Sequence, residues 1–255
     1  MKFAVCVKHA VDETELKIDS SGKPLLEGSP SKIGTFDKNA VEEALRLKAA
    51  LGGEVVAVTV GKPEARKSLK EALAMGVDKG VHVLAGTGVL DASRTSELLA
   101  AAIAKTGPYD LVICSEGSSD TYTGLVPPMV AERLRIPYIG YVRKLEVAAQ
   151  AVKAERSLEE SLESVESSLP SVVSVVSEIN EPRYPTLIQI MQASKKPVEE
   201  LTPQQLGVGD IQAYVRTISM TAQAMNRKHV VFEGSPEEAA SKLVDALASE
   251  GVIPR

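Results

Sequence analysis

Short apolar runs alternate with amphipathic segments between Met1 and Val142. We interpret the runs as strands and the segments between them as helices, because apolar residues recur in those segments with helical spacing. The predicted strands are Phe3–Val7, Glu54–Val60, Lys79–Leu84, Leu111–Cys114 and Tyr138–Val142, and the predicted helices are Asn39–Leu51, Lys62–Met75, Ala92–Lys105 and Pro128–Arg135. This alternation is typical of βαβ units and predicts an α/β fold with a doubly wound, mainly parallel sheet.

The pattern changes after Leu145. Residues 146–170 mix alanine, glutamate and serine, and they fit either a charged helix or polar strands with alternating side chains. The next run, Ser171–Val176, is a predicted strand. Near the end of the chain, Ser235 suits an N-cap and Pro236 suits the first helical position, so a closing amphipathic helix is predicted within Ser235–Ile253.

Residues 180–209 are predicted to be extended, because prolines interrupt them at Pro182, Pro185, Pro197 and Pro203. This stretch is either an exposed linker or an arm that wraps a partner subunit. The arm is the sharper hypothesis, because the apolar side chains of Leu187, Ile188, Ile190 and Met191 need to be buried. We therefore expect an α/β domain over residues 1–178 and a long C-terminal arm with a helix over residues 179–255.

Composition narrows the class of protein. The chain has 255 residues, of which 44% are hydrophobic and 25% charged, as in ordinary globular proteins. Its net charge of -5, its lack of a basic stripe and its 4% aromatic content argue against nucleic-acid binding. No apolar run reaches the ~20 residues of a membrane span. Met1-Lys2 leads directly into the first predicted strand, so no signal peptide is expected and the protein is predicted to be cytoplasmic.

The cysteines and histidines suggest no catalytic or metal centre. Cys6 and Cys114 lie within apolar runs, which favours structural thiols over reactive ones. His9, His82 and His229 are scattered along the chain, so neither a metal cluster nor a Ser-His-Asp triad is predicted.

Three strand ends fall on one edge of the predicted sheet: Val7–Ala10, Val60–Pro63 and Ser115–Gly124. Ligands of open α/β sheets bind beyond the carboxyl ends of the strands. The third segment is rich in small and hydroxylated residues and precedes a predicted helix, so it suits a phosphate or nucleotide. A simple serine-rich connection is the other interpretation. Neither G-x-G-x-x-G nor G-x-x-x-x-G-K-[ST] is present, so a bound nucleotide is held in another way.

The segment Ile179–Leu187, which contains Asn180-Glu181-Pro182-Arg183-Tyr184, resembles the signature of the β subunits of electron-transfer flavoproteins. The residues Ile190–Lys196 that follow it match the same signature. Other segments agree with the resemblance, and they are Val7-Lys8 with Asp12, Phe36–Lys48, Ala72–Asp78 and Asp120–Gly124 with Pro128. The similarity covers the whole chain and is clearest up to about residue 210.

The resemblance implies a heterodimer with an α subunit that holds most of the redox-active FAD. The β subunit has a Rossmann-like or flavodoxin-like, adenine-nucleotide-binding fold and carries AMP, or a second FAD in the electron-bifurcating branch. No residue is implied as catalytic. The implied nucleotide contacts are Cys6, Gly34, Thr35, Phe36, Asp37, Val60, Ser115, Glu116, Gly117, Ser118, Ser119, Asp120, Thr121, Tyr122 and Thr123.

The resemblance also implies a docking surface for partner proteins. Tyr184, Leu187, Ile188 and Met191 lie in the segment with which the family docks on dehydrogenases, acyl-CoA dehydrogenases among them. A quinone oxidoreductase is the implied acceptor. An exposed leucine on a proline-stiffened loop suits an anchor that fills a partner's pocket.

Two departures from the family pattern concern the nucleotide. Gly34-Thr35-Phe36 stands where members usually have Asn-Pro-Phe, and Tyr122 and Leu125 stand where members have an acidic residue and a glutamine. A glycine pair usual before Pro170 is also missing, so the surroundings of the α-subunit FAD are expected to differ.

Asp12–Asp19 and Lys38-Asn39-Ala40 look more like the bifurcating and nitrogen-fixation-associated members. That branch implies a second FAD, with electrons from NADH passed separately to a quinone-directed path and to ferredoxin or flavodoxin. The alternative is a stand-alone ATP- or AMP-binding protein resembling the universal stress proteins. Such a protein would not need the segment Asn180–Lys196.

Overall fold

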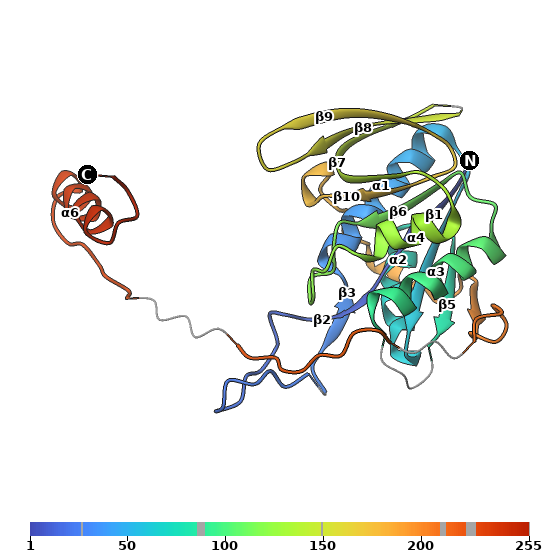
Figure 1. Cartoon of the computed structure of the whole chain (residues 1–255), viewed down its shortest axis with the longest axis horizontal. Coiled ribbons are helices and arrows are strands. Elements are labelled where there is room, and N and C mark those ends of the chain that lie inside the picture. The colour runs from blue at the N-terminus through green and yellow to red at the C-terminus, as the bar shows by residue number, and fades with distance from the viewer. Residues whose placement is uncertain (27, 86–89, 149, 210–212, 223–227, 255) are drawn as a thin grey trace.

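The computed structural model describes residues 1–26, 28–85, 90–148, 150–209, 213–222 and 228–254. Within these residues, nine strands form one sheet with helices on both of its faces (Figure 1). The strand order is β11-β5-β4-β1-β6-β10-β7-β8-β9. The strands from β11 to β7 pair in parallel, and β8 and β9 continue the sheet antiparallel. The prediction of a doubly wound, mainly parallel α/β fold is confirmed.

In the N-terminal half, the four predicted strands lie within one residue of their predicted bounds, whereas the first two helices begin four residues from their predicted starts and a short hairpin was not predicted. The strands of the sheet are β1 (Lys2–Cys6), β4 (Glu54–Gly61), β5 (Lys79–Leu84), β6 (Leu111–Ser115), β7 (Tyr138–Val147), β8 (Ala151–Ser157), β9 (Leu162–Ser168), β10 (Ser171–Val175) and β11 (Val198–Leu201), while β2 (His9–Val11) and β3 (Ser31–Ile33) pair as a separate hairpin. The helices are α1 (Thr35–Leu51), α2 (Arg66–Met75), α3 (Ala92–Thr106), α4 (Val126–Leu134), α5 (Leu187–Ala193) and α6 (Pro236–Ser249), with short 3-10 turns η1 (Pro63–Ala65) and η2 (Ser177–Ile179).

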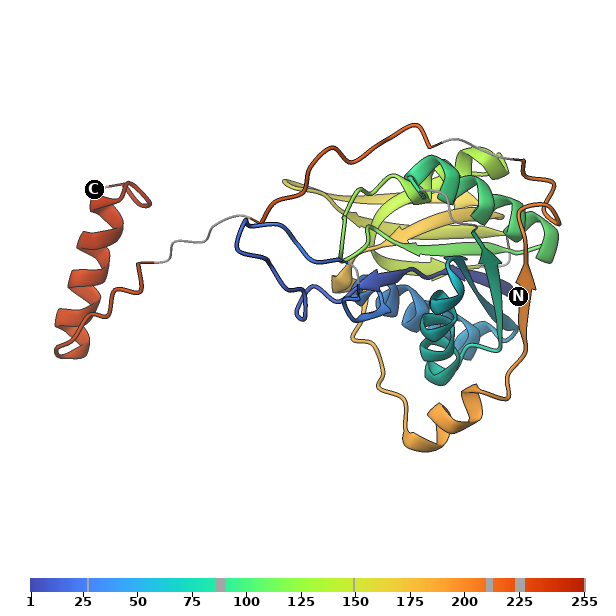
Figure 2. The same ribbon diagram turned by 90° about the horizontal axis from the view of Figure 1, so that it is seen from below.

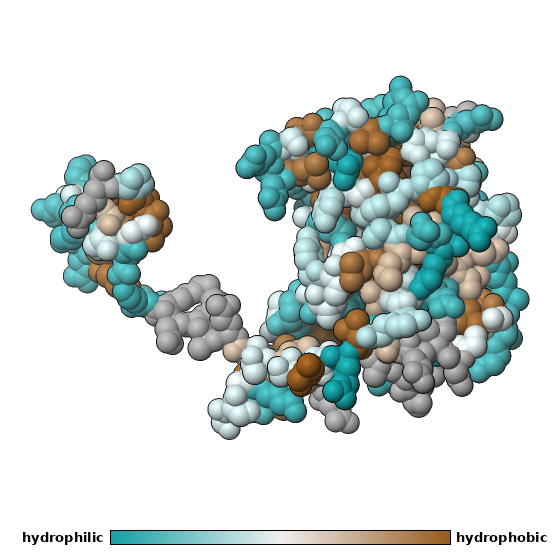
Figure 3. Space-filling view, in the orientation of Figure 1, coloured by the Kyte–Doolittle hydropathy of each residue, from teal (hydrophilic) through white to brown (hydrophobic). Residues whose placement is uncertain are grey.

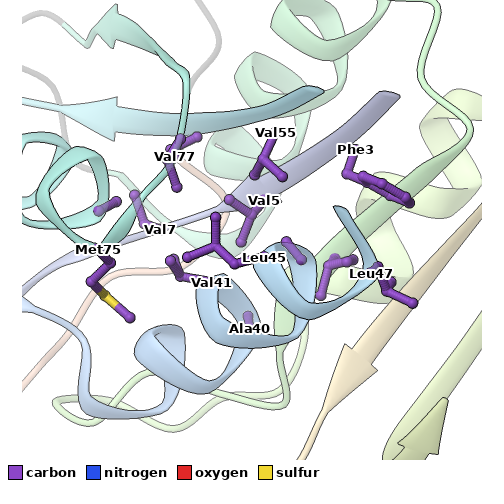
Figure 4. Close-up of a cluster of buried hydrophobic side chains, with 14 of the residues drawn as sticks. Phe3, Val5, Val7, Ala40, Val41, Leu45, Leu47, Val55, Met75 and Val77 are labelled. Carbon is purple, nitrogen blue, oxygen red and sulfur yellow. The ribbon is translucent and has the colours of Figure 1, made fainter. Parts of the chain in front are cut away.

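The strands are apolar throughout because helices cover both faces of the sheet. On β1, Phe3 and Val5 belong to the core under α1 and α2, and Ala4 and Cys6 belong to the core under α3 and α4. Val41 and Leu45 of α1 lie against Val5 (Figure 4). This two-sided burial fixes the register of β1, since a shift by one residue would exchange the two sets.

The strand order differs from sequence order beside β6. The chain leaves β6 through α4 and forms β7, β8 and β9 before β10 inserts between β6 and β7. All five residues of β10 are buried, whereas only three of the ten residues of β7 are buried. A strand that is apolar on both faces needs two covered faces, so β10 takes the inner position.

Two segments whose sequence indicated no single conformation or a wrong one, residues 146–170 and 180–209, contain regular helices or strands. Residues 151–157 and 162–168 are an antiparallel strand pair, so the strand interpretation of the 146–170 region is confirmed and the helix is wrong. Residues 180–209 were predicted to be extended. This prediction is wrong for α5, which is a helix, and it did not include the pairing of β11 with the sheet. Thr186 and Gln189 form a capping box that starts α5, and β11 pairs with β5 at the edge of the sheet.

The closing helix α6 is confirmed, with Ser235 and Glu238 forming a capping box at its start. It stands away from the rest of the molecule (Figures 1 and 2). None of its residues is buried, and Leu243 and Val244 are exposed. The surface of this helix includes hydrophobic areas (Figure 3). In the described part of the chain, no helix has the length and apolarity needed to cross a membrane.

Candidate functional site at the carboxyl ends of β1 and β6

The strands β1 and β6 are neighbours from which the chain departs in opposite directions. After β1 it crosses through α1 to β4, and after β6 it crosses through α4 toward β7. The helices α1 and α4 lie on opposite faces of the sheet. The carboxyl ends of such a strand pair form the switch point at which doubly wound sheets bind ligands.

Asp37 joins three elements at this point. Its side chain is buried in the first turn of α1, where Oδ2 accepts a hydrogen bond from the Lys8 backbone N–H at 2.7 Å. Oδ1 accepts one from the Ser115 hydroxyl at 2.5 Å, at the end of β6. Burial raises the pKa of Asp37 to about 6, although both hydrogen bonds favour the ionised form. The carboxylate needs the space beside Gly34, since a Cβ there would lie 2.5 Å from Oδ2.

Lys8 connects the end of β1 to the loop after β6. Its ammonium lies 2.6 Å from Asp120 Oδ1, 3.2 Å from Ser118 Oγ and 3.3 Å from Thr121 Oγ1. Burial of Asp120 opposes its ionisation, but the Lys8 ammonium together with hydrogen bonds from Ser118 and the Val11 backbone holds the pKa of Asp120 below its ordinary value. The charge of Lys8 is thus held among hydroxyl groups at the switch point.

The loop between β6 and α4 is held by its own backbone and by β10. The Glu116 N–H donates to the Val175 carbonyl, and the Tyr122 N–H donates to the Ser118 carbonyl. Within the described residues, the Ser119 hydroxyl is buried without a hydrogen-bond partner. Such a group requires a partner, and a ligand oxygen would supply one.

The structure brings together most of the predicted contact residues. Hydrogen bonds, ring contacts or close approaches join nine of them, and Glu116 and Ser119 lie in the same loop: the nine are Gly34, Phe36, Asp37, Ser115, Gly117, Ser118, Asp120, Thr121 and Tyr122. Thr35 and Thr123 are exposed beside them. Whether each of these residues contacts a nucleotide stays a prediction.

The two remaining predicted contacts, Cys6 and Val60, lie on β1 and on its neighbour β4. Cys6 is the last residue of β1 and is opposite Val58 of β4, and Val60 follows two residues later. Cys6 and Cys114 are both buried, and the Cys6 thiol together with burial raises the pKa of Cys114. The prediction of core thiols is confirmed.

Lys8 is the functional candidate missing from the predicted contacts. The signal was present in the sequence, because Lys8 is a cation directly after a buried strand on the ligand-binding edge. What the sequence does not show is that its long side chain reaches Asp120, more than a hundred positions away.

The predicted docking residues lie on a segment that α1 braces. The Arg183 guanidinium makes two hydrogen bonds to the Glu42 carboxylate, at 2.7 and 2.9 Å, and Asn180 exchanges hydrogen bonds with Asn39. Beyond this attachment Tyr184 is 90% exposed and Leu187 is 73% exposed, with Ile188 and Met191 also exposed. These apolar side chains are thus not buried within this chain, and their burial against a partner stays a prediction.

The donor set fits an adenine nucleotide. The Lys8 ammonium and the hydroxyls of Ser118, Ser119 and Thr121 suit phosphate oxygens. The Asp37 carboxylate is buried and hydrogen-bonded through both oxygens, so it holds the two strand ends beside these donors. Within the described residues, no group of three or more His, Cys, Asp or Glu side chains is placed to hold a metal ion.

Comparison with known proteins gives one consistent result. Residues 25–206 match the family model described as the electron transfer flavoprotein domain. The chain is 36% identical to the electron transfer flavoprotein subunit beta of Thermoanaerobacterium thermosaccharolyticum and 35% identical to that of Bacillus subtilis. It is 32% identical to the caffeyl-CoA reductase-Etf complex subunit CarD of Acetobacterium woodii. Each match covers 99% of this chain and 100% of the relative.

Proposed function

The chain belongs to the electron transfer flavoprotein family as a β subunit, and from this premise we propose that its switch-point site binds an adenine nucleotide. Membership makes it one subunit of a heterodimer with an α subunit, in which a flavin carries the electrons. Relatives that match over their whole length are named as subunits, so the stand-alone stress-protein alternative is not favoured.

The observation that carries the nucleotide proposal is the junction made by Asp37. One buried carboxylate joins the backbone after β1 to the hydroxyl that ends β6, and Lys8 extends from that junction among the hydroxyls of the next loop. A cation and hydroxyl donors at a switch point suit a phosphate ester. In this proposal, Cys6, Gly34, Thr35, Phe36, Val60 and the loop from Ser115 to Thr123 surround the rest of the nucleotide.

We propose that the nucleotide is a second FAD, with AMP as the alternative. The proposal is supported by the resemblance of Asp12–Asp19 to the bifurcating branch and by the similarity to a subunit of a CoA-reductase complex. A flavin supplies reversible one- and two-electron chemistry, and the protein binds and orients it and excludes water. NADH would then be the donor, with a quinone-directed path and ferredoxin or flavodoxin as acceptors.

The exposed side chains on and before α5 support a docking role. Tyr184, Leu187, Ile188 and Met191 present apolar surface from a segment that Arg183 and Asn180 fix to α1. We propose that this surface binds a dehydrogenase, with an acyl-CoA dehydrogenase as the first candidate. A preorganised apolar anchor loses little conformational entropy on binding.

We propose further that residues 179–255 act as the arm that wraps the α subunit. Among the described residues, α6 has no buried side chain, while its capping box and apolar stripe are those of a stable helix that packs on something. Exposed Leu243 and Val244 are its candidate contacts with the α subunit.

The proposed nucleotide is tested by purifying the heterodimer, denaturing it and quantifying the released cofactors by chromatography. Two FAD per heterodimer support the second-flavin proposal, and one FAD with one AMP supports a simple electron carrier. Release of ATP from a β chain that binds no α subunit would overturn both.

A further inference from the structure

Tyr122 has a backbone conformation that bulky residues rarely adopt. Its φ is 42°, in the left-handed region, where a branched or large side chain is an outlier that needs support from its surroundings. Such outliers gather at ligand-binding loops and active sites. Tyr122 lies in the loop after β6, two positions beyond Asp120, which holds the Lys8 ammonium.

Three neighbours hold the aromatic ring in place. The Phe36 ring meets it edge to face, with centroids 5.6 Å apart and planes inclined at 66°. Gly117 lies beneath it, where a Cβ would come within 3.0 Å of the ring. Burial and the adjacent Glu116 carboxylate raise the pKa of Tyr122, so its hydroxyl keeps its proton at neutral pH.

The supported ring is nevertheless open to ligand. Tyr122 is 55% exposed, and Phe36 beside it is partly exposed. Phe36 directly precedes Asp37, so the aromatic pair borders the junction at which β1, β6 and α1 meet. Tyr141, on β7, is a second exposed tyrosine with left-handed backbone, at φ 58°, and it lies close enough to Tyr122 to interact electrostatically.

We propose that Tyr122, held by Phe36, is a stacking platform for the planar ring of the nucleotide bound at the switch point. This inference rests on the proposed function and deepens it. Adenine and isoalloxazine share the chemistry that the platform recognises, a flat π surface. Tyr122 thus binds the planar ring, while Lys8 and the hydroxyls bind the phosphate end.

The geometry separates this role from a purely structural one. A residue needed only to form the turn would be small or would be asparagine or glycine, which adopt left-handed backbone at little cost. A ring needed only for packing would be buried, whereas this ring keeps more than half of its surface open.

The experiment compares the purified heterodimer with three variants of its β subunit. Tyr122→Asn removes the ring and suits the left-handed backbone, so it is expected to fold. Tyr122→Phe keeps the ring, and Tyr214→Asn removes another solvent-facing tyrosine far from the loop in the sequence, which is 81% exposed. For each protein, the fluorescence per bound flavin and the rate of AMP release on dilution are measured, together with the cofactor content after denaturation.

A stacked isoalloxazine predicts that Tyr122→Asn raises the fluorescence per flavin at least twofold. A stacked adenine predicts instead that AMP is released about tenfold faster, since stacking of one base on an aromatic side chain accounts for an effect of this order. In either case Tyr122→Phe and Tyr214→Asn match the wild type. Equal values for the asparagine and phenylalanine variants overturn the platform. A wild-type heterodimer that releases neither flavin nor adenine nucleotide overturns the proposed function itself, so the two failures are distinguishable.

Discussion

The Asp37 carboxylate accepts a hydrogen bond from the Ser115 hydroxyl at 2.5 Å, which joins the first turn of α1 to the end of β6. The two residues are far apart in the sequence, and each follows from a different local pattern. Because Asp37 also accepts the Lys8 N–H, one buried carboxylate sets the spacing of the two strand ends between which we place the nucleotide.

Asp37 makes stability depend on pH. Its pKa is raised from 3.8 to about 6 by burial, so the folded state holds the proton more tightly than the unfolded chain does. The corresponding stability is present below pH 3.8 and is lost as the pH rises to about 6, by about 3 kcal/mol at most. Asp37→Asn, which cannot ionise, should therefore gain stability relative to the wild type over this range. Urea unfolding at pH 4, 5, 6 and 7 measures the difference, and parallel pH profiles for the two proteins would contradict it.

Lys8→Met should lower the nucleotide content of the purified heterodimer with little loss of folding stability. The lysine side chain is 43% exposed, and ion pairs at that exposure contribute about 0–1 kcal/mol, so the ammonium is expected to matter more for the ligand. Lys32→Met is a matched control, because Lys32 pairs with Asp12 at 2.8 Å with similar exposure of both partners. Adenine nucleotide per heterodimer is measured after denaturation. If both variants lost the same amount of nucleotide, the effect would not be specific to Lys8, and its proposed contact with the phosphate would be wrong.

Leu187→Ala should slow electron exchange with the dehydrogenase that we propose as partner by about tenfold or more, because a central leucine anchor is worth about 1.4 kcal/mol or more of binding. Flavin content should not change. The control is Leu162→Ala, an exposed leucine on the edge strand β9. Stopped-flow reduction of the heterodimer by the dehydrogenase measures the rate. If Leu187 instead packs under the α subunit, the variant loses the heterodimer, and gel filtration distinguishes this outcome.

The sequence predicted the features that local interactions determine better than those that depend on contacts between residues far apart in the chain. The bounds of β5 were predicted residue for residue and those of α3 to within one residue, because local periodicity and terminal signals determine them. The insertion of β10 between β6 and β7 was not predicted. The order of strands in the sheet depends on contacts between residues far apart in the sequence. For the loop between β6 and α4, the residue types were visible in the sequence. The reach of Lys8 to Asp120 and the left-handed backbone of Tyr122 were not, because both depend on tertiary packing.

Removal of α6 should weaken the heterodimer without unfolding the β subunit. A chain that ends before Ser235 keeps both core clusters, which contain no residue of α6. The helix has an apolar stripe that includes Leu243 and Val244, and these side chains are exposed in the isolated chain. Because Leu243 is 46% exposed and Val244 is 53% exposed, burying the rest of both side chains against the α subunit would contribute about 1.5–3 kcal/mol of the association free energy before entropic costs. The truncated chain and Leu243→Asp should therefore both raise the dissociation constant of the heterodimer by at least tenfold, while Lys242→Ala, which alters a neighbouring exposed side chain, should not.

Analytical ultracentrifugation measures the constant, and thermal unfolding of the β subunit alone shows whether its fold is intact. An unchanged dissociation constant in both variants would place the contact surface of the arm between residue 179 and Gly234 instead.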